Sequence, residues 1–348
     1  MSCPDRPAPA SRQVRRCGGV LALIAVSASA LACSLNVRPT LPDALMMELW
    51  QPPADLPSRD LYGGPGGRDL APAPNGRYAF VSVKSSGSNP GYDVKDAQGR
   101  IWSVKLGVES RTEVVVSRLV WAAGYHQPLV YYVPRWTLVR DGRAIPQPAG
   151  RFRLESETQK KVGEWSWRDN PFLGTRPMAG LFVLMVLVNN WDLSTVQNAV
   201  YAVGGDGGGP RVRYMVRDLG ASLGRTRWLA LSTKDDPAGF EGEPFIREID
   251  GSRVRFEYQG AFKEPHLHTG VTIDDVYWVC GLLARLSEGQ WHDAFRASGF
   301  TQEETARYVR RLRQKVAEGL DLGRTAPIAH IRAGDVSPSA PTLDDARP

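Results

Sequence analysis

Apolar and polar positions along residues 77–324 form two successive patterns. Up to about residue 140, apolar residues mostly alternate with polar ones, as in half-buried strands. A helical stripe interrupts this part from Val114 to Ala122, and Gly124 ends it. The alternation predicts short strands at 77–84, 92–95, 100–106, 129–133 and 136–140. We therefore expect a small strand-rich lobe over residues 77–140.

The second part, residues 141–324, is expected to form a larger and mostly helical lobe. It contains the uncharged apolar segment 178–188, which is long enough for a buried helix but too short for a membrane span. Strands at 198–203 and 211–217 form a hairpin, and residues 272–322 show helical stripes of apolar side chains. Together the two parts predict an α+β fold with two lobes.

Segments rich in proline and glycine flank the two lobes. Residues 33–76 are expected to form a tether and an irregular lead-in over the domain surface. Residues 325–348 have a similar composition and predict a disordered tail. Because 42% of the chain is apolar and 23% is charged, the region between them has the side chains for a sizeable core.

Residues 1–32 have the composition of a signal peptide. A positive stretch ending in Arg15-Arg16 precedes an apolar run over residues 18–32, which is too short to span a bilayer. The sequence Ala30-Leu31-Ala32-Cys33 fits cleavage by ordinary signal peptidase before Cys33. It also resembles a bacterial lipobox, although Ala30 stands where leucine is usual. We therefore predict an exported lipoprotein of the cell envelope, tethered to the membrane through Cys33. A free N-terminal Cys33 and an uncleaved anchor are the alternatives.

Charge and cysteine content narrow the class of partner. The whole chain carries +6, and it falls to +3 without residues 1–32, because four arginines and one aspartate leave. A near-balanced chain predicts no nucleic-acid partner, since that requires a concentrated basic face. Cys3 and Cys17 leave with the signal, and Cys33 is expected to be modified. Cys280 then has no partner, so no disulfide framework is expected.

A lysine and two glutamates stand out against the first predicted elements. Lys105 lies in the otherwise apolar strand 100–106, and a buried ammonium needs an anionic partner. Glu113 lies eight residues further along, near the start of the helix, and Glu109 is the rival partner. We expect the pair to form with Glu113. An exposed lysine on an edge strand and an ordinary acidic helix start explain the same residues.

Three further segments carry polar or glycine residues at element ends. The turn 86–91 contains Gly87 and Gly91, and Asp192 and Asn198 follow the apolar helix. Asp218 begins Asp218-Leu219-Gly220 after the second strand of the hairpin. Each segment also has a plain structural explanation, as a hairpin loop, a helix cap and a turn respectively.

The order of these elements resembles the protein-kinase-like superfamily. The resemblance covers residues 77–224 and is strongest to divergent branches, namely the spore-coat CotH-type kinases, the Golgi casein kinases and the HipA-type kinases. It implies a kinase-like two-lobe fold and an exported phosphotransferase that uses ATP or another nucleotide with Mg²⁺ or Mn²⁺. Lys105 and Glu113 would then position the phosphates, and the turn with Gly87 and Gly91 would cover them.

The resemblance also implies roles for the later residues. Asp192 would orient the acceptor, and Asp218 and Asn198 would hold the metal ion. Asn198 follows Asp192 by six positions, where the protein-kinase pattern has five. The acceptor, whether protein, sugar or small molecule, is not indicated. Nucleotidyl transfer is a closely related possibility.

Other interpretations compete with a transferase. A non-enzymatic envelope lipoprotein that uses the kinase-like fold as a binding module is the main alternative, because ATP is scarce outside the bacterial cytoplasm. His266 and His268 form a His-x-His pair, but no third metal ligand is nearby in sequence. The basic residues from Arg307 to Lys315 predict a solvated helix face.

Overall fold

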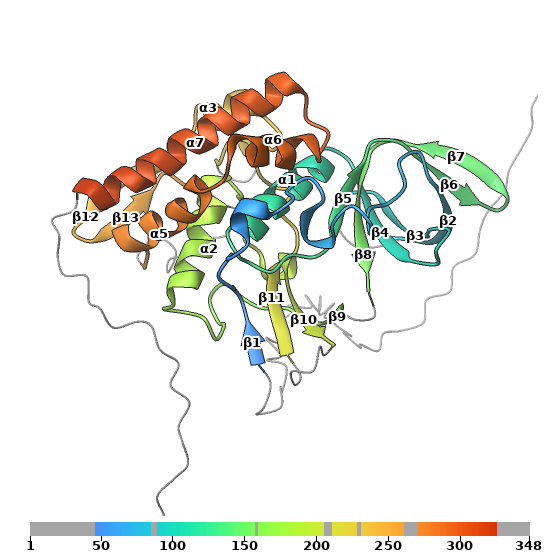
Figure 1. The fold of residues 1–348 in the computed structure, drawn as a ribbon, viewed down its shortest axis with the longest axis horizontal. Coiled ribbons are helices and arrows are strands. Elements are labelled where there is room, and N and C mark those ends of the chain that lie inside the picture. The colour runs from blue at the N-terminus through green and yellow to red at the C-terminus, as the bar shows by residue number, and fades with distance from the viewer. Residues whose placement is uncertain are drawn as a thin grey trace, which may run out of the picture. The chain divides into compact units, whose positions relative to one another are not determined.

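The computed structural model describes residues 46–84, 89–156, 159–204, 211–227, 231–260 and 270–325. All of them belong to one compact unit. The protein is α+β, with sheets in its N-terminal half and helices in its C-terminal part, as predicted (Figure 1). Gly87, His266, His268 and Cys33 lie outside the described residues.

The strand-rich part is a seven-stranded sheet in the order β5-β8-β4-β3-β2-β6-β7. Neighbouring strands are antiparallel except for the parallel pair of β2 and β6. The strands are β2 (Arg77–Val83), β3 (Gly91–Lys95), β4 (Ile101–Leu106), β5 (Val130–Val133), β6 (Trp136–Arg140), β7 (Arg143–Gln147) and β8 (Gly150–Glu155). All five strands expected in this lobe are present.

The sheet extends beyond residue 140, where the sequence suggested the end of the small lobe. Strand β8 lies between β4 and β5 and carries the sheet to Glu155. Its sequence was hard to recognise, because Arg151 and Arg153 alternate with Phe152 and Leu154 and both arginines are buried. Because arginine is mostly exposed in proteins, both residues are expected from the sequence to face solvent, and only their partners in the fold explain their burial.

Alternation along β4 and β8 separates the two faces of the sheet. Trp102, Val104 and Phe152 are fully buried in the apolar cluster on one face. The residues between them point to the other face, because successive side chains in a strand alternate. Cross-strand pairs share a face, so Lys105 lies beside its partner Arg151, and Ser103 beside Arg153. The polar face therefore carries three basic side chains.

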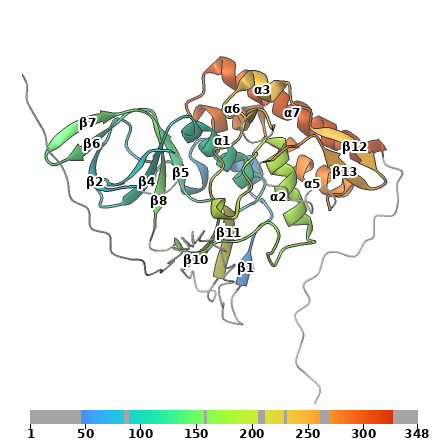
Figure 2. The same ribbon diagram turned by 180° about the vertical axis from the view of Figure 1, so that it is seen from behind.

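Helix α1 (Glu109–Ala122) connects the sheet to the helical part (Figure 2). Gly107, at φ 94°, turns the chain sharply between β4 and the helix, which places Glu109 close to the end of the strand. The apolar side of α1, including Val115, Val116 and Leu119, joins the larger core. The helix contacts β5, β8 and the helix α6 (Glu288–Arg296).

The helical part is built around α2 (Arg176–Leu187), the predicted apolar helix. Thr175 caps it by accepting a hydrogen bond from the Met178 amide, and Asn189, at φ 54°, follows its end. Two further helices, α5 (Ile273–Ala284) and α7 (Gln302–Thr325), contact α2 and each other. Within the described ranges, no helix is long and apolar enough to cross a membrane.

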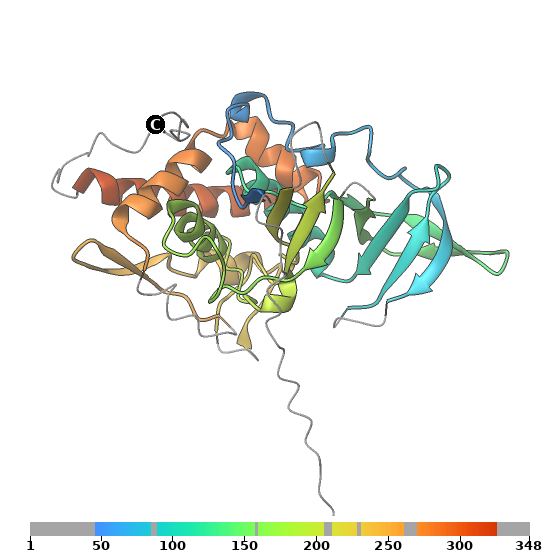
Figure 3. The same cartoon turned by 90° about the horizontal axis from the view of Figure 1, so that it is seen from below.

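A four-stranded sheet lies beside these two parts, in the order β1-β11-β10-β9 (Figure 3). Its strands are β1 (Met46–Glu48), β9 (Gln159–Gly163), β10 (Asn198–Val203) and β11 (Arg211–Val216). The β10–β11 hairpin was predicted. Strand β1 shows that the lead-in is anchored, since it pairs with β11 and is followed by the buried Leu49, Leu56 and Leu61.

Candidate active site: a lysine–carboxylate cluster in a basic cavity

Three carboxylates surround the ammonium group of Lys105. Its Nζ lies 2.7 Å from Asp218 Oδ2, 2.7 Å from Glu109 Oε2 and 3.3 Å from Glu113 Oε2. Burial by itself lowers the pKa of Lys105, but the three carboxylates outweigh it and raise this pKa above its ordinary value. Lys105 is therefore a buried, charged group and not an exposed lysine.

The expectation that Lys105 pairs with Glu113 rather than Glu109 was wrong in its exclusive form. Both glutamates reach it, because they lie four residues apart and share a face of α1. Glu113 has a second partner, Arg151, whose Nε lies 2.7 Å from Glu113 Oε1. Glu113 thus lies between two buried cations on neighbouring strands.

Asp218 is placed by the end of β11 and the turn that follows. Its Oδ1 accepts a hydrogen bond from the Gly220 amide at 3.1 Å, and the Gly220 carbonyl accepts one from the Thr112 hydroxyl at 2.8 Å. A Cβ at Gly220 would lie 2.7 Å from Glu109 Cβ, so the turn needs a glycine to pack against α1. Burial by itself raises the pKa of Asp218. The charge and hydrogen bonds of Lys105 have the opposite and larger effect, so the pKa is lowered to about 2.

Asp192 lies in the loop after α2. Its amide donates to Asn190 Oδ1 at 3.0 Å, and its Oδ2 accepts a hydrogen bond from Gln197 Nε2 at 2.9 Å. The other oxygen, Oδ1, is buried and has no hydrogen-bond partner among the described residues. The Trp191 amide ties this loop to the segment after Asp218 by donating to the Ala221 carbonyl at 3.1 Å. Asp192 caps no helix, because the short 3₁₀ turn that follows starts after Ser194.

The structure separates Asn198 from the other predicted site residues. Asn198 is fully buried, and its Nδ2 donates to the Trp165 carbonyl at 3.0 Å. Gln197 lines the cavity instead, beside Asp192, and its backbone carbonyl accepts a hydrogen bond from the Asp218 amide at 3.2 Å. Sequence reasoning missed Gln197, although it occupies the fifth position after Asp192, where the protein-kinase pattern has its asparagine.

The packing of β3 against β4 explains why a glycine occupies position 91. A Cβ there would lie 2.3 Å from the Val104 carbonyl oxygen, so only glycine allows this approach of β3 to β4. The preceding turn reaches the site through Asn89, whose Nδ2 donates to Glu109 Oε2 at 2.7 Å.

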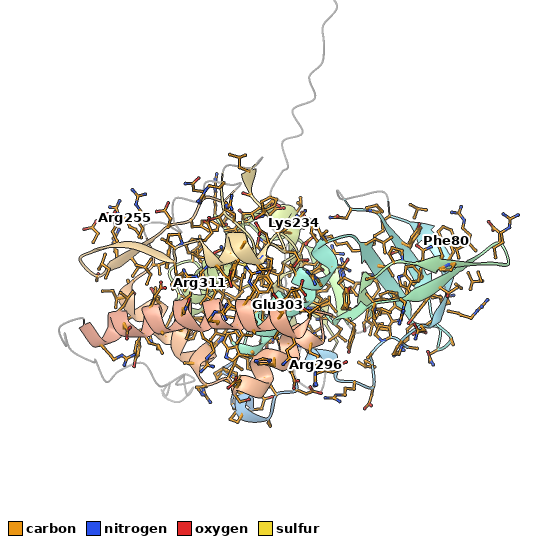
Figure 4. All side chains as sticks on the ribbon, turned by 90° about the horizontal axis from the view of Figure 1, so that it is seen from above. Phe80, Lys234, Arg255, Arg296, Glu303 and Arg311 are labelled. Atoms are coloured by element: carbon orange, nitrogen blue, oxygen red, sulfur yellow. The ribbon has the colours of Figure 1, made fainter. Side chains whose placement is uncertain are left out.

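These groups line a cavity of about 550 Å³. Of its sixteen lining residues, seven are basic and four are acidic, so it favours an anionic ligand. Lys105, Asp192 and Asp218 all line it. The lining is formed by Lys84, Asn89, Lys105, Glu109, Arg151, Arg153, Lys161, Glu164, Trp191, Asp192, Val196, Gln197, Arg217, Asp218, Ala221 and Lys234. Lys234, labelled in Figure 4, also pairs with Glu109.

The donor set fits a nucleotide that brings its own cation. In the part of the chain that is described, no three histidines, cysteines, aspartates or glutamates are placed to hold a metal ion. Mg²⁺ bound with a nucleotide usually takes only one or two protein ligands, and phosphates and water supply the rest. The Asp218 carboxylate and the Gln197 side-chain oxygen are of the right type. Asp192 Oδ1 and Arg217 Nε, both buried without a hydrogen-bond partner among the described residues, indicate that the cavity wall has capacity for a polar ligand.

An arginine on α1 fixes the helix that carries the two glutamates. Arg111 pairs with Asp235 and, through Nη2 at 2.7 Å, with Glu304 Oε1 at the start of α7. Its guanidinium also lies over the Phe300 ring. Arg111 thus ties α1 to the segment after Asp218 and to α7.

The basic face expected on α7 is only partly solvated. Arg307 and Arg310 pair with Glu241 at the surface, but Lys315 is fully buried. Lys315 Nζ donates to the Leu187 carbonyl at 3.1 Å and to Asn189 Oδ1 at 2.7 Å. The expectation of a solvated side chain was therefore wrong for Lys315, because the end of α2 offers acceptors for its amine.

No family model matches this chain, and no curated protein matches it. Among solved structures, it is similar to the proinflammatory kinase CtkA of Helicobacter pylori, at 11% identity and a TM-score of 0.44 over 72% of this chain and 98% of that one. It is also similar to the Golgi casein kinase, at 11% identity and a TM-score of 0.34 over 74% of this chain and 75% of that one. The same kinase with Mn/ADP bound gives 11% identity and a TM-score of 0.35, over 73% and 74%.

These solved structures are kinases, in line with the resemblance expected from the sequence. All three TM-scores lie below 0.5. The function proposed below therefore depends on the geometry of the site and not on the likeness.

Proposed function

We propose that this protein is a kinase-like phosphotransferase that binds ATP or another nucleotide with Mg²⁺ or Mn²⁺ in the cavity around Lys105. The observation that carries the proposal is the position of Lys105 Nζ, 2.7 Å from Asp218 Oδ2 and within ion-pair distance of Glu113. Strand β4 and the end of β11 thus supply Lys105 and Asp218 to a cavity that Asp192 also lines. Glu113 of helix α1 pairs with Lys105 but is not part of that lining.

The phosphate-binding role would belong to Lys105 and Glu113. Asp218, with Gln197 beside it, would hold the cation and so release Lys105 from its direct contact with Asp218. Lys105 would then donate to the phosphates, while Glu113 stays oriented through its pair with Arg151. The nucleotide, when bound with its cation, supplies the phosphoryl group to be transferred. Positioning and charge stabilisation are the main contributions a protein makes to this chemistry.

The acceptor would bind on the Asp192 side of the cavity. Asp192 Oδ2 is held by Gln197, which leaves Oδ1 free of other described partners to accept a hydrogen bond from an acceptor hydroxyl. Asn198, predicted as a metal ligand, is not part of the lining, so Gln197 is the better candidate for the second oxygen ligand.

Thermal unfolding with nucleotide and metal tests the proposal. ATP with Mg²⁺ or Mn²⁺ should stabilise the wild type, by about 2.7 kcal/mol at a hundredfold excess over the dissociation constant. Asp218→Asn should remove the metal-dependent part and keep the fold, because Lys105 retains two carboxylates. Asp192→Asn should bind nucleotide normally and lose transfer.

A matched control is Asp250→Asn, which changes an exposed carboxylate on β12 (Ile246–Asp250) and should alter neither readout. If no nucleotide at millimolar concentration stabilises the wild type, the transferase is excluded. The non-enzymatic binding module then becomes the better explanation.

Export and lipidation of Cys33 are part of the same proposal. They are supported by the basic and apolar segments before Cys33 and by its lipobox-like sequence. Metabolic labelling with a fatty acid should tag the wild type, and Cys33→Ala should lose both the tag and the membrane association. A variant that stays in the membrane fraction would indicate an uncleaved anchor instead.

A further inference from the structure

A second group of cations lies on the same wall of the cavity as Lys105. The pairing of β4 with β8 puts Ser103 and Arg153 on the face that also carries Lys105, one residue pair further along the strands. Lys84, just after β2, and Arg217, just after β11, line the cavity as well. The group of Lys84, Arg153 and Arg217 is called the basic wall below.

Two cations of the basic wall share one hydroxyl group. Ser103 Oγ accepts a hydrogen bond from Arg153 Nη2 at 3.1 Å and another from Lys84 Nζ. A neutral hydroxyl holds the two positive charges close together without compensating either. Burial, followed by the charges of Arg151 and Arg153, lowers the pKa of Lys84 to about 7. The arrangement of these side chains thus disfavours the charge on Lys84.

The carboxylates of the described residues do not balance the basic wall. Among these residues, Arg153 pairs only with Glu155, at 3.4 Å and with nearly half of its side chain exposed. The charge of Asp93 raises the pKa of Lys84, but less than burial and the two arginines lower it. Among the described residues, neither Lys84 nor Arg217 has a carboxylate within ion-pair distance, and Arg217 Nε is buried without a hydrogen-bond partner. Residues 85–88, which follow Lys84, contain no acidic residue.

Apolar side chains in the lining lie elsewhere. Trp191, Val196 and Ala221 belong to the loops next to Asp192 and Asp218, and none lies on β4 or β8. An aromatic base binds best in an apolar slot, so the basic wall is better suited to an anion than to a base. Arginine and lysine side chains that converge on one point are typical of phosphate recognition.

We propose that Lys84, Arg153 and Arg217 form a second anion subsite, which holds a phosphate group in addition to the one beside Lys105 and Asp218. The inference rests on the proposed function, because it takes the first phosphate position to be at Lys105. The second group has one of two sources: a longer phosphate chain on the donor, such as inorganic triphosphate, or a phosphate carried by the acceptor.

The test measures binding of orthophosphate and inorganic triphosphate by calorimetry and thermal unfolding. Each of Lys84→Gln, Arg153→Gln and Arg217→Gln should weaken triphosphate binding about tenfold, since a hydrogen bond to a charged group is lost. Without ligand, the same changes should raise the melting temperature, because each removes one of three positive charges that repel one another. If a cation served only to stabilise the fold, its replacement would lower the melting temperature.

Arg255→Gln is the control, on β13 (Arg253–Phe256) and labelled in Figure 4 well apart from Phe80 of the seven-stranded sheet. Like the three test variants, Arg255→Gln removes one positive charge. Because its hairpin is outside the cavity lining, it should not change triphosphate affinity. Arg217→Gln removes no ion pair of the described residues, so it keeps the test decisive if Arg153→Gln fails to fold.

The two sources give different results once Mg²⁺ and nucleotide saturate the protein. A phosphate of the acceptor predicts that orthophosphate adds further stabilisation, which the three variants reduce. A longer donor chain predicts no addition and a triphosphate affinity at least equal to that of the nucleotide.

The subsite is wrong if the three variants bind triphosphate as the wild type does, or if Arg255→Gln weakens it equally. In that case nucleotide binding that depends on Asp218 still supports the transferase. Conversely, triphosphate binding that depends on the basic wall, without nucleotide binding or transfer, supports the subsite and excludes the proposed function.

Discussion

Two buried lysines, one in each part of the molecule, have opposite environments. Lys105 on β4 has three carboxylates within 3.3 Å, and they raise its pKa. Lys315 on α7 has neutral oxygens from Leu187 and Asn189 and lies 4.4 Å from the Phe240 ring centroid. Burial, followed by the charge of Arg311, lowers the pKa of Lys315 well below its ordinary value.

The difference separates a cation available to a ligand from one that completes a helix end. Lys105 keeps its charge and lines a cavity, as the proposed phosphate-binding role requires. Lys315 lies in the core and satisfies a carbonyl at the end of α2 that the helix itself leaves unpaired. Burial of a lysine is therefore no sign of function by itself; the charge of its partners and its access to the cavity are.

Replacing each lysine by methionine should show the largest contrast. Lys105→Met leaves three carboxylates without their shared cation and should cost about 3–5 kcal/mol of unfolding free energy, together with the nucleotide-dependent stabilisation. Lys315→Met keeps the buried volume, removes two hydrogen bonds to neutral oxygens and should cost about 2 kcal/mol. Chemical denaturation with and without nucleotide measures both. Nucleotide stabilisation that persists in Lys105→Met would contradict the role of Lys105.

The two glutamates beside Lys105 should differ as well. Glu113→Gln removes the only carboxylate that Arg151 contacts within the described residues, and it should cost roughly 3 kcal/mol. Glu109→Gln should cost about 1 kcal/mol, because Lys105 keeps two carboxylates and Lys234 is partly exposed. Denaturation curves for both variants give the comparison. Equal losses would mean that Arg151 finds another partner.

The basic wall should make the free energy of unfolding depend on pH. The pKa of Lys84 is about 7 in the folded protein against an ordinary 10.5, so between these values the unfolded chain binds more protons. Unfolding free energy should therefore rise with pH across this window, and the penalty is fully present below about pH 7. Lys84→Met should flatten that part of the curve. A slope unchanged in Lys84→Met would mean that Lys84 stays charged throughout.

A small effect on stability is also expected at Arg111. Arg111→Met breaks the pairs with Asp235 and Glu304 and should cost about 1 kcal/mol, because both the arginine and Glu304 are partly exposed. Since α1 carries Glu109 and Glu113, transfer activity should fall more than stability does. Assays of transfer beside thermal unfolding separate the two. Rescue by Arg111→Lys would show that the charge is sufficient.

Local patterns in the sequence were enough to predict many of the strands and helices that carry the site. The alternation in residues 77–106 and the apolar segment before Asn189 predicted β2, β3, β4 and α2, because each element buries one face or all of itself. Lys105 was recognisable as well, since a charged residue in an apolar strand requires a partner. Asp218 was recognisable through the resemblance of Asp218-Leu219-Gly220 to the kinase Asp-x-Gly, but its direct contact with Lys105 was not predicted.

Other parts of the site were not recognisable from local patterns. Asn198 was chosen over Gln197 by residue type, and only the fold shows that Asn198 is held by the Trp165 carbonyl while Gln197 lines the cavity. Strand β8 was missed because its arginines look solvent-exposed in sequence. The partners that make their burial tolerable, Glu113 and Ser103, lie 38 or more residues away.

The sequence by itself determined the types and order of the elements and the need of Lys105 for an anion, because these depend on side-chain periodicity and on the cost of burying a charge. Tertiary structure decided which charges meet. Pairing of β4 with β8 brings Arg151 and Arg153 to the wall of Lys105, and the β10–β11 hairpin returns Asp218 to it. Electrostatic interactions act through space and fall with distance, so the balance of cations and carboxylates in the cavity exists only once these distant segments are packed together.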